Sequence, residues 1–309
     1  MEFSNGTVLE DLPFFNGYYA ARGEPLLIGY PGYPYIKAVR NSDDDIWVIY
    51  DLSEEDTASV SPEEKGKYLS VMEERNLNPL NDRDAFESDE IFASFRPLKG
   101  GSLKENLLFR SSSPIDNTWQ RAKYADELCE TYGIRCIVNL ADSEEKLQEL
   151  LETSDSPCYK KLYEEGKVLF PEISIGFETP EIQTKIARSL NEMIRYEGPY
   201  FLHCSLGKDR SGFVSLLLEM LAGAAYQEML EDYTRTYESF CRITEKSDPE
   251  KYKTIEDNNF IQLIRCIVND ESIDLKNADL VPYARAYLLS GGMSAFDLSL
   301  PESAILIQD

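Results

Sequence analysis

The sequence has a single histidine, His203, in 309 residues. One imidazole excludes every metal site that needs two histidine ligands, and the spacing of the cysteines and carboxylates gives no positive support for another kind of metal site. The six cysteines are sparse for this length and include no C-x-x-C pair. We therefore expect no metal and no disulfide scaffold, with one or two individual bridges left open.

Basic residues are also scarce, because 31 Lys and Arg stand against 56 Asp and Glu and give a formal net charge of -25. This charge repels nucleic acids and anionic lipid surfaces at long range, so we expect no nucleic-acid partner. No apolar run approaches the roughly 18 residues of a membrane-spanning helix. The start of the sequence lacks the basic and then apolar pattern of a secretory signal. We expect a soluble protein with no stable membrane insertion, either cytoplasmic or secreted.

The first 89 residues differ in composition from the rest of the chain. They are rich in Gly, Pro and Tyr at first and then acidic, with short β-favouring runs at 26–30, 33–39 and 46–51 and a short helix expected near 62–75. From residue 90 on, apolar runs of strand length alternate with runs of helical period, which is typical of an α/β layer structure. We predict a β-rich N-terminal unit with an acidic connector over 1–89, and an α/β domain over 90–309.

Apolar spacing and helix-ending residues locate the main elements of the α/β domain. Helices are expected at 117–132, 180–194, 213–221, 224–240, 250–269 and 278–290, and strands at 134–140 and 199–203. The helix at 180–194 follows Thr179, a good cap, and begins with Pro180, which suits a first helical turn.

A polar turn, CSLGKDRSG, separates the strand at 199–203 from the next helix. A strand, a glycine-containing turn and a helix direct backbone N–H groups and the positive end of the helix dipole at an anion. The spacing C-x5-R is a weak signal alone, since Cys129 and Arg135 share it, but Cys129 lies on the apolar face of a predicted helix. Only Cys204 and Arg210 have the full pattern around them, which predicts a phosphate-binding loop.

The chemistry of this loop follows from its residue types. A thiol that faces backbone amides at a helix N-terminus loses its proton readily, so we expect Cys204 to be a thiolate and the nucleophile. The planar guanidinium of Arg210 can hold two phosphate oxygens through the transition state. The backbone N–H groups from Ser205, Leu206 and Gly207 onward would complete the cradle.

Three neighbours, Lys208, Asp209 and Ser211, have two readings each. Lys208 adds positive charge for the substrate and Asp209 can protonate the leaving oxygen, or the two form a simple ion pair. Ser211 can donate to the sulfur when water cleaves the phosphocysteine, or it caps the helix. His203 precedes Cys204 on a strand, so the two side chains point to opposite faces, which argues against a cysteine protease. We expect His203 to hydrogen-bond backbone near the loop.

The segment HCSLGKDRSG resembles the H-C-x-x-G-K-D-R-S/T-G loop of an atypical bacterial family of tyrosine and lipid phosphatases, within the protein tyrosine phosphatase superfamily. Segments at 92–96, 108–112 and 137–142 are similar to further motifs of that family, and the resemblance covers about 90–298. It implies a cysteine phosphatase fold with a central, mostly parallel sheet flanked by helices, a phosphocysteine intermediate, no cofactor, and Asp209 as the acid. Arg110 could contact substrate phosphate or pair with a nearby carboxylate.

These observations predict a phosphate monoester hydrolase of the protein tyrosine phosphatase type. The expected partners are phosphorylated proteins or peptides, with phosphoinositides as further substrates because of Lys208. Two alternatives stay open. One is a soluble inositol polyphosphate phosphatase. The other is an inactive module that binds phosphate or phosphoproteins, for which the usual sign is loss of the nucleophile or the arginine, and both are present here.

Overall fold

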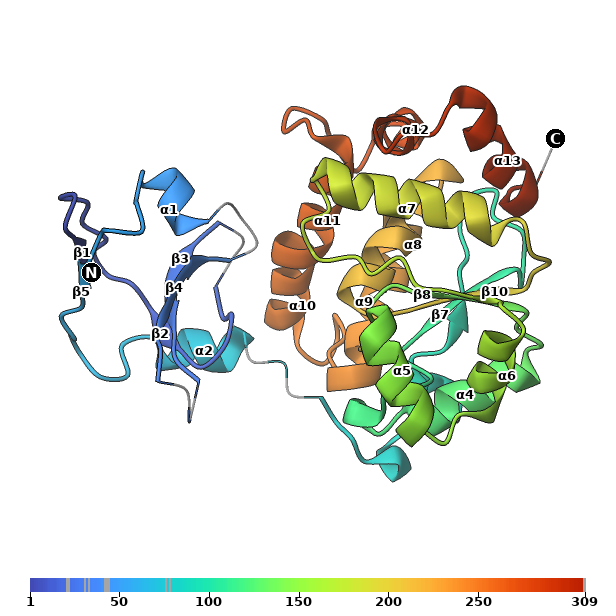
Figure 1. Cartoon of the computed structure of the whole chain (residues 1–309), viewed down its shortest axis with the longest axis horizontal. Helices are drawn as coiled ribbons and strands as arrows, with labels where there is room; N and C mark the ends of the chain where they lie inside the picture. The colour runs from blue at the N-terminus through green and yellow to red at the C-terminus, as the bar shows by residue number, and fades with distance from the viewer. Residues whose placement is uncertain are drawn as a thin grey trace. The chain divides into compact units, whose positions relative to one another are not determined.

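The structure is a computed structural model that describes residues 1–20, 23–30, 32, 34–41, 45–75, 77 and 79–307. The chain divides into two compact units, Met1–Leu77 and Asn78–Asp309 (Figure 1). Each unit has hydrophobic clusters of its own. Among the helices of the described residues, none has both the length and the apolar character that a membrane crossing requires.

The first unit is rich in short strands, as predicted. Strands β2 (Phe14–Phe15), β3 (Pro25–Ile28) and β4 (Lys37–Arg40) form one sheet, and β1 (Glu2–Phe3) pairs with β5 (Ala58–Ser59). Helix α2 (Leu69–Arg75) confirms the helix expected near 62–75. The β-favouring run at 33–39 begins at Tyr33, which lies outside the described residues.

The strand expected at 46–51 is wrong, because Ile46–Ile49 form a single helical turn, α1. Only Ile46 of this turn is buried. The Tyr50 N–H bonds back to the Ile46 carbonyl at 3.1 Å, so the segment satisfies its own backbone. A β-branched run favours a strand only where a neighbouring strand offers hydrogen-bond partners.

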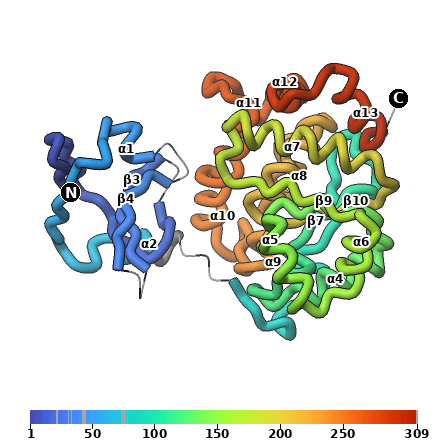
Figure 2. The backbone as a smooth tube through the Cα atoms, in the orientation of Figure 1, coloured from blue at the N-terminus to red at the C-terminus, as the bar shows by residue number. Residues whose placement is uncertain are grey.

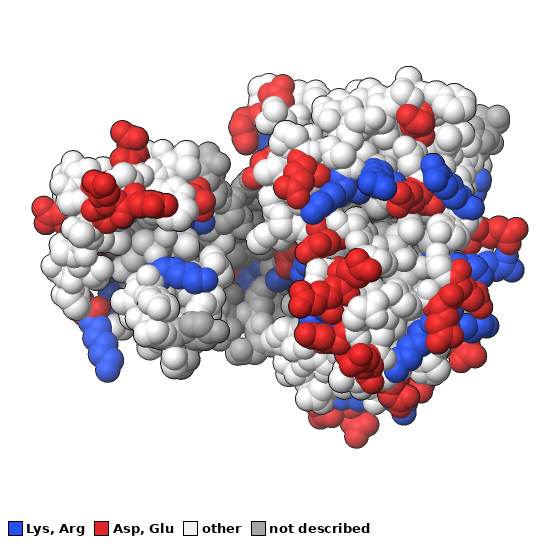
Figure 3. All heavy atoms as spheres, in the orientation of Figure 1, with Lys and Arg blue, Asp and Glu red and all other residues white. Residues whose placement is uncertain are grey.

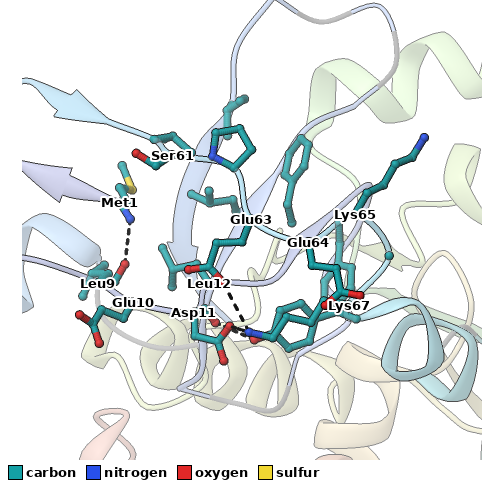
Figure 4. A pocket seen from close by; sticks show the side chains of 18 of the residues that line it. Met1, Leu9, Glu10, Asp11, Leu12, Ser61, Glu63, Glu64, Lys65 and Lys67 are labelled. Atoms are coloured by element: carbon teal, nitrogen blue, oxygen red, sulfur yellow. Dashed lines mark hydrogen bonds and ion pairs between the residues drawn. The ribbon is translucent and has the colours of Figure 1, made fainter.

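The first unit also contains an apolar cavity of about 580 Å³. Phe14, Ile36 and Val60 are among its lining side chains. Charged side chains stand at its edge, where Lys67 pairs with Asp11 and Glu63 (Figure 4). All of its lining residues belong to the first unit, and none belongs to the predicted phosphate loop.

The described residues after Leu77 belong to the second unit, which moves the predicted boundary near 90 to the point between Leu77 and Asn78. The Leu80 N–H donates to the Phe240 carbonyl at 2.7 Å. The buried guanidinium of Arg121 donates to the Leu80 carbonyl and to Asn81 Oδ1. These residues therefore complete the α/β domain and do not form part of a separate connector.

The second unit is built on a five-stranded sheet in the order β6-β7-β10-β8-β9. Only β6 runs antiparallel, and this confirms the predicted central, mostly parallel sheet. Every residue of the three middle strands is buried, as parallel strands covered on both faces require. The strands are β6 (Arg96–Pro97), β7 (Leu108–Ser111), β8 (Cys136–Asn139), β9 (Val168–Leu169) and β10 (Tyr200–His203).

Helices cover both faces of this sheet (Figure 1). On one face lie α4 (Ala122–Thr131), α5 (Glu144–Thr153) and α6 (Pro157–Glu164). On the other lie α7 (Pro180–Met193) and α8 (Asp209–Leu221), with α11 (Ile261–Val268) and α12 (Val281–Ser290) packed outside them.

The remaining helices complete the second unit. They are α3 (Asp89–Ala93), α9 (Tyr226–Cys241), α10 (Pro249–Ile255) and α13 (Ala295–Ile305). Helices α12 and α13, at the red end of the tube in Figure 2, both pack against α7. The helix expected at 250–269 is α10 and α11 joined by a short π-helical segment, Glu256–Phe260.

Candidate active site

The segment 204–210, called here the 204–210 loop, follows the central strand of the sheet and runs into α8. His203, the last residue of β10, lies opposite Ser111 of β7 and Asn139 of β8. The carboxyl ends of three parallel strands therefore meet at this loop, which is where open α/β sheets bind ligands. The first N–H groups of α8 lack partners within the helix and are available to an anion.

Gly207 fixes how closely the loop approaches β7. Its φ is +69°, in the left-handed region. A Cβ atom at this position would lie 2.8 Å from the Ser112 nitrogen and closer still to the Ser111 carbonyl. Because backbone atoms cannot yield as the end of a flexible side chain can, only glycine fits here. The Ser113 N–H also donates to the Ser205 carbonyl at 3.1 Å, so the loop is held along the end of β7.

Cys204 is 3% exposed and lies directly after β10. The other cysteine with an arginine six residues later has quite different surroundings. Cys129 lies in the apolar cluster between the sheet and α4, and its burial raises the pKa of its thiol well above the ordinary value. Arg135 is exposed and pairs with Glu197. The structural reading of that pair is confirmed, and Cys204 is the cysteine that begins a loop at a helix N-terminus.

Arg210 lies in the first turn of α8 and reaches the end of the neighbouring strand β8. Its Nη1 donates to the Ala141 carbonyl at 3.1 Å. Asp142 follows Ala141, and burial raises the pKa of this carboxyl although Arg210 acts in the opposite direction. Among the described residues this is the one hydrogen bond given to the Arg210 side chain, which leaves its other N–H groups for a ligand.

Lys208 and Asp209 form the ion pair that was one of their two readings. Lys208 Nζ lies 3.6 Å from Asp209 Oδ1, and Asp209 raises the pKa of Lys208 against the effect of burial. The ammonium group also lies 5.5 Å from the centre of the Tyr237 ring. The Asp209 side chain is 46% exposed, and ion pairs in such positions are weak. The pair therefore leaves the carboxylate accessible to a leaving group.

Ser211 and His203 are both buried beside the loop. The Ser211 hydroxyl has no partner among the described residues, so the expected bond to the Cys204 sulfur is not formed. His203 packs on Phe201 and Tyr159, and burial lowers its pKa to about 3. The Cys204 backbone opposes this shift, but neither ring nitrogen makes a hydrogen bond of ordinary geometry. The role of His203 in shaping the loop stays a prediction.

The expectation that Arg110 contacts substrate phosphate is not met, because its side chain does not reach the surface. It is 0% exposed, its Nη1 donates to Asp232 Oδ2 at 2.6 Å and its Nη2 donates to the Gly207 carbonyl at 2.7 Å. The pairing with a carboxylate, which was the alternative reading, is the one that the structure contains. Arg110 therefore lies beneath the 204–210 loop and supports it from inside the domain.

Sequence reasoning assigned no role to Trp119, which contacts the loop, or to Arg96, which belongs to the charge network beneath it. Trp119, in a short 3-10 helix at Asn117–Trp119, is partly buried and donates its Nε1–H to Ser205 Oγ at 3.2 Å. Arg96 of β6 shares Asp232 with Arg110. The sequence did indicate that Arg96 has a partner, because an arginine buried among apolar residues needs a buried acidic group. Nothing local in the sequence indicated which acidic residue that would be.

A comparison with protein families identifies the type of domain. A model described as "Tyrosine phosphatase family" matches residues 92–278, which is more than half of the chain and includes the 204–210 loop. No curated protein matches the sequence. One solved structure with a match is the core catalytic domain of the PP-IP phosphatase SIW14 from S. cerevisiae in complex with citrate. It is 18% identical with a TM-score of 0.30, and the match covers 55% of this chain and 90% of that chain. A likeness this low carries no argument about the substrate.

Proposed function

Because the chain belongs to the tyrosine phosphatase family and is a phosphatase, we propose that it acts through a phosphocysteine intermediate and prefers phosphotyrosine in proteins or peptides. The observation that carries the proposal is the 204–210 loop. It combines a cysteine directly after the central strand, the free N–H groups of a helix start, and an arginine fixed at the end of the next strand. These are the parts that nucleophilic attack on a phosphate monoester needs.

In the first step, the Cys204 sulfur attacks phosphorus, so that an S–P bond forms while the bond to the ester oxygen breaks. Asp209, whose side chain is nearly half exposed at the loop, gives its proton to the leaving oxygen. Arg210 and the loop N–H groups hold the three remaining oxygens as charge develops on them.

In the second step, water attacks phosphorus and the S–P bond breaks. The Asp209 carboxylate takes a proton from the attacking water, which restores the acid for the next cycle. Inorganic phosphate leaves and Cys204 returns to its thiolate. The Ser211 hydroxyl, which is buried and has no hydrogen-bond partner among the described residues, can turn toward the departing sulfur.

The surroundings of the loop favour an aryl phosphate over a polyanion. The indole of Trp119 stands beside Ser205 and offers an apolar wall to a phenyl ring. Asp116 and Asp142 are close enough to affect one another, and Asp142 lies near Arg210, so carboxylates border the positive loop. Acidic side chains are also spread over the visible face of the molecule in Figure 3, in keeping with the net charge of -25.

The first test compares Cys204→Ser and Asp209→Asn with the unaltered protein on a phosphotyrosine peptide. We expect Cys204→Ser to lose at least about 10³-fold in kcat, because the nucleophile is gone. Asp209→Asn should lose about 10²-fold or more, and less on an aryl phosphate whose phenol is a good leaving group. Cys158→Ser, a partly buried cysteine outside the loop, is the matched control and should keep full activity. Full activity of Cys204→Ser would end the proposal.

The same proteins then distinguish the substrate classes. We expect kcat/KM to be higher for the phosphotyrosine peptide than for inositol polyphosphates or for phosphoinositides in vesicles. Faster turnover of an inositol polyphosphate would instead assign the chain to the soluble inositol phosphatases. Tight phosphate binding by the unaltered protein without turnover of any ester would assign it to the inactive binding modules.

A further inference from the structure

We propose that Arg110 is a positioning residue for the reaction, which holds the Gly207 carbonyl and so keeps the 204–210 loop in its anion-binding shape. Asp232, on α9, in turn holds the Arg110 guanidinium. The inference rests on the proposed function, since it concerns the same loop. It assigns a role in the reaction to a residue that does not contact the substrate and that lies far from the loop in the sequence.

The first observation is a buried charge network beneath the loop. Asp232 Oδ1 accepts from Arg96 Nε at 2.6 Å, and Oδ2 accepts from Arg110 Nη1 at 2.6 Å and, at 3.3 Å, from Arg96 Nη2. Arg96 also donates to the Asp232 carbonyl at 2.7 Å and to Thr236 Oγ1 at 3.0 Å. The network therefore ties β6 and β7 to α9, and Arg110 is its only described member that also reaches the loop.

The second observation is the direction of the Gly207 carbonyl. In a loop that binds an anion, the N–H groups point inward, and each carbonyl must point away from the negative charge. The Gly207 carbonyl accepts from Arg110 Nη2 at 2.7 Å, on the buried side of the loop. If this peptide turned over, its carbonyl would face the phosphate and the Lys208 N–H would be lost to it. The bond from Arg110 therefore selects the orientation that binds.

A second contact also fixes the position of Gly207. The backbone of Ser111 and Ser112 lies so close that no Cβ fits at position 207. Gly212, one helical turn further into α8, leaves similarly little room, with the Tyr233 ring 2.9 Å from the place of a Cβ and Arg110 Nη2 3.4 Å from it. The guanidinium thus lies beside Gly212, in a narrow space between α8 and α9 where position 212 has no side chain to crowd it.

The charges of the network give it an electrostatic role too. Two arginines face one ionised carboxylate, Asp232, whose pKa the arginines hold below its ordinary value against the effect of burial. Glu219 of α8 lies near the same groups, fully buried and with neither carboxyl oxygen hydrogen-bonded among the described residues. Burial raises the pKa of Glu219 well above its ordinary value, which favours its uncharged form. The two arginines then face a single carboxylate, Asp232, beneath the loop.

Stability is a poor explanation for such a network. Burying charges costs several kcal/mol for each ion, and well-packed apolar residues of the same volume often stabilise a protein more. The cost is understandable if the network fixes a geometry that apolar residues cannot specify. Arginine suits this task because the N–H groups of its planar guanidinium donate to Asp232 and to the Gly207 carbonyl in fixed directions. A lysine ammonium has no such fixed arrangement of donors.

The test uses the full chain with Arg110→Lys, which keeps the charge and loses the fork. We expect kcat/KM on a small aryl phosphate to fall about 100-fold, as for a misplaced catalytic group. Inhibition by vanadate, a phosphate mimic, should weaken by a similar factor, because the loop loses its anion-binding shape. Asp232→Asn, which keeps the shape of the side chain, should give a smaller loss of the same kind and serves if Arg110→Lys does not fold.

The matched control is Arg265→Lys. Arg265, on α11 of the same unit, also holds two backbone carbonyls with its guanidinium, those of Asp270 and Ile273, and its partners lie outside the loop. It should lower the melting temperature and leave kcat/KM and vanadate inhibition within about twofold below that temperature. If Arg110→Lys and Asp232→Asn also change only the melting temperature, the inference is overturned. A failure of the proposed function is distinguishable, because the unaltered protein would then lack activity.

Discussion

Cys204, Cys129 and Cys136 are all buried, yet only one of them is placed for chemistry. Burial raises the pKa of Cys136 to about 12, and that of Cys129 is raised for the same reason. Both thiols therefore stay protonated and behave as small apolar side chains. Cys204 instead stands between the last residue of β10 and the first N–H groups of α8. At the scale of the residue, position relative to the backbone separates the proposed nucleophile, Cys204, from the two other cysteines.

A prediction at this scale concerns Trp119. Replacing it with alanine removes the apolar wall beside Ser205, so Trp119→Ala should lower kcat/KM for a phosphotyrosine peptide about 3- to 10-fold. A phosphoserine peptide, which has no ring to contact the indole, should be affected much less. Steady-state kinetics on both peptides measures the difference.

The sequence provides a matched control for this experiment, because Trp47 is its only other tryptophan. Trp47 is 59% exposed and belongs to the first unit, so Trp47→Ala should leave both rates unchanged. Equal losses on the two peptides with Trp119→Ala would show that the indole supports the loop in general and does not select an aromatic substrate.

At the scale of the element, the ends of strands β7 and β8 place the loop. Asn139 closes the end of β8, since its Oδ1 accepts from the N–H groups of Ala141 and Asp142. Its Nδ2 donates to Asp142 and to the Tyr159 hydroxyl. The turn formed in this way presents the Ala141 carbonyl to Arg210. Asn139 is therefore a structural residue that orients the arginine through the backbone.

The close approach of the loop to β7 gives a second prediction. Gly207→Ala should abolish activity, because the new methyl group meets the backbone of Ser111 and Ser112 and pushes the loop away. Gly133→Ala is the control, since Gly133 also has a positive φ of +63° but nothing stands within 4 Å of a Cβ there. That control should lose about 1 kcal/mol of unfolding free energy and keep its kcat. Full activity of Gly207→Ala would show that the loop does not need this contact.

At the scale of the whole molecule, the chain consists of two units with separate cores. The residues assigned to catalysis, and the network that supports them, all belong to the second unit. We therefore expect a shortened chain of residues 78–309 to fold and to keep kcat/KM on a small aryl phosphate within about twofold.

A chain shortened further to residues 90–309 tests the boundary between the units. It loses the bond from Leu80 to Phe240 and leaves the buried Arg121 without two of its acceptors. Its free energy of unfolding should fall by at least about 1–3 kcal/mol relative to the longer chain, as measured by urea denaturation. Equal stability of the two chains would mean that residues 78–89 are not part of the domain.

The sequence by itself determined the 204–210 loop, its flanking strand and helix, and most helices of the domain. These features are local, because the apolar period, the glycine and the polar turn that specify them lie within a few tens of residues. A run such as 46–51 has no such safeguard, and it forms a helical turn that is closed by its own backbone hydrogen bonds.

Tertiary structure decided which residues support that loop. Asp232 lies 122 positions from Arg110, and the loop glycine that Arg110 holds lies 97 positions from it. The sequence left two partners open for Arg110, since a buried arginine requires a carboxylate but does not say which one. The packing of α9 against β6 and β7 brings Asp232 to Arg110. Because Arg110 is fully buried, it does not contact the substrate. Pairs of residues this far apart in the sequence depend on how the helices pack against the sheet, and no local sequence pattern specifies that packing.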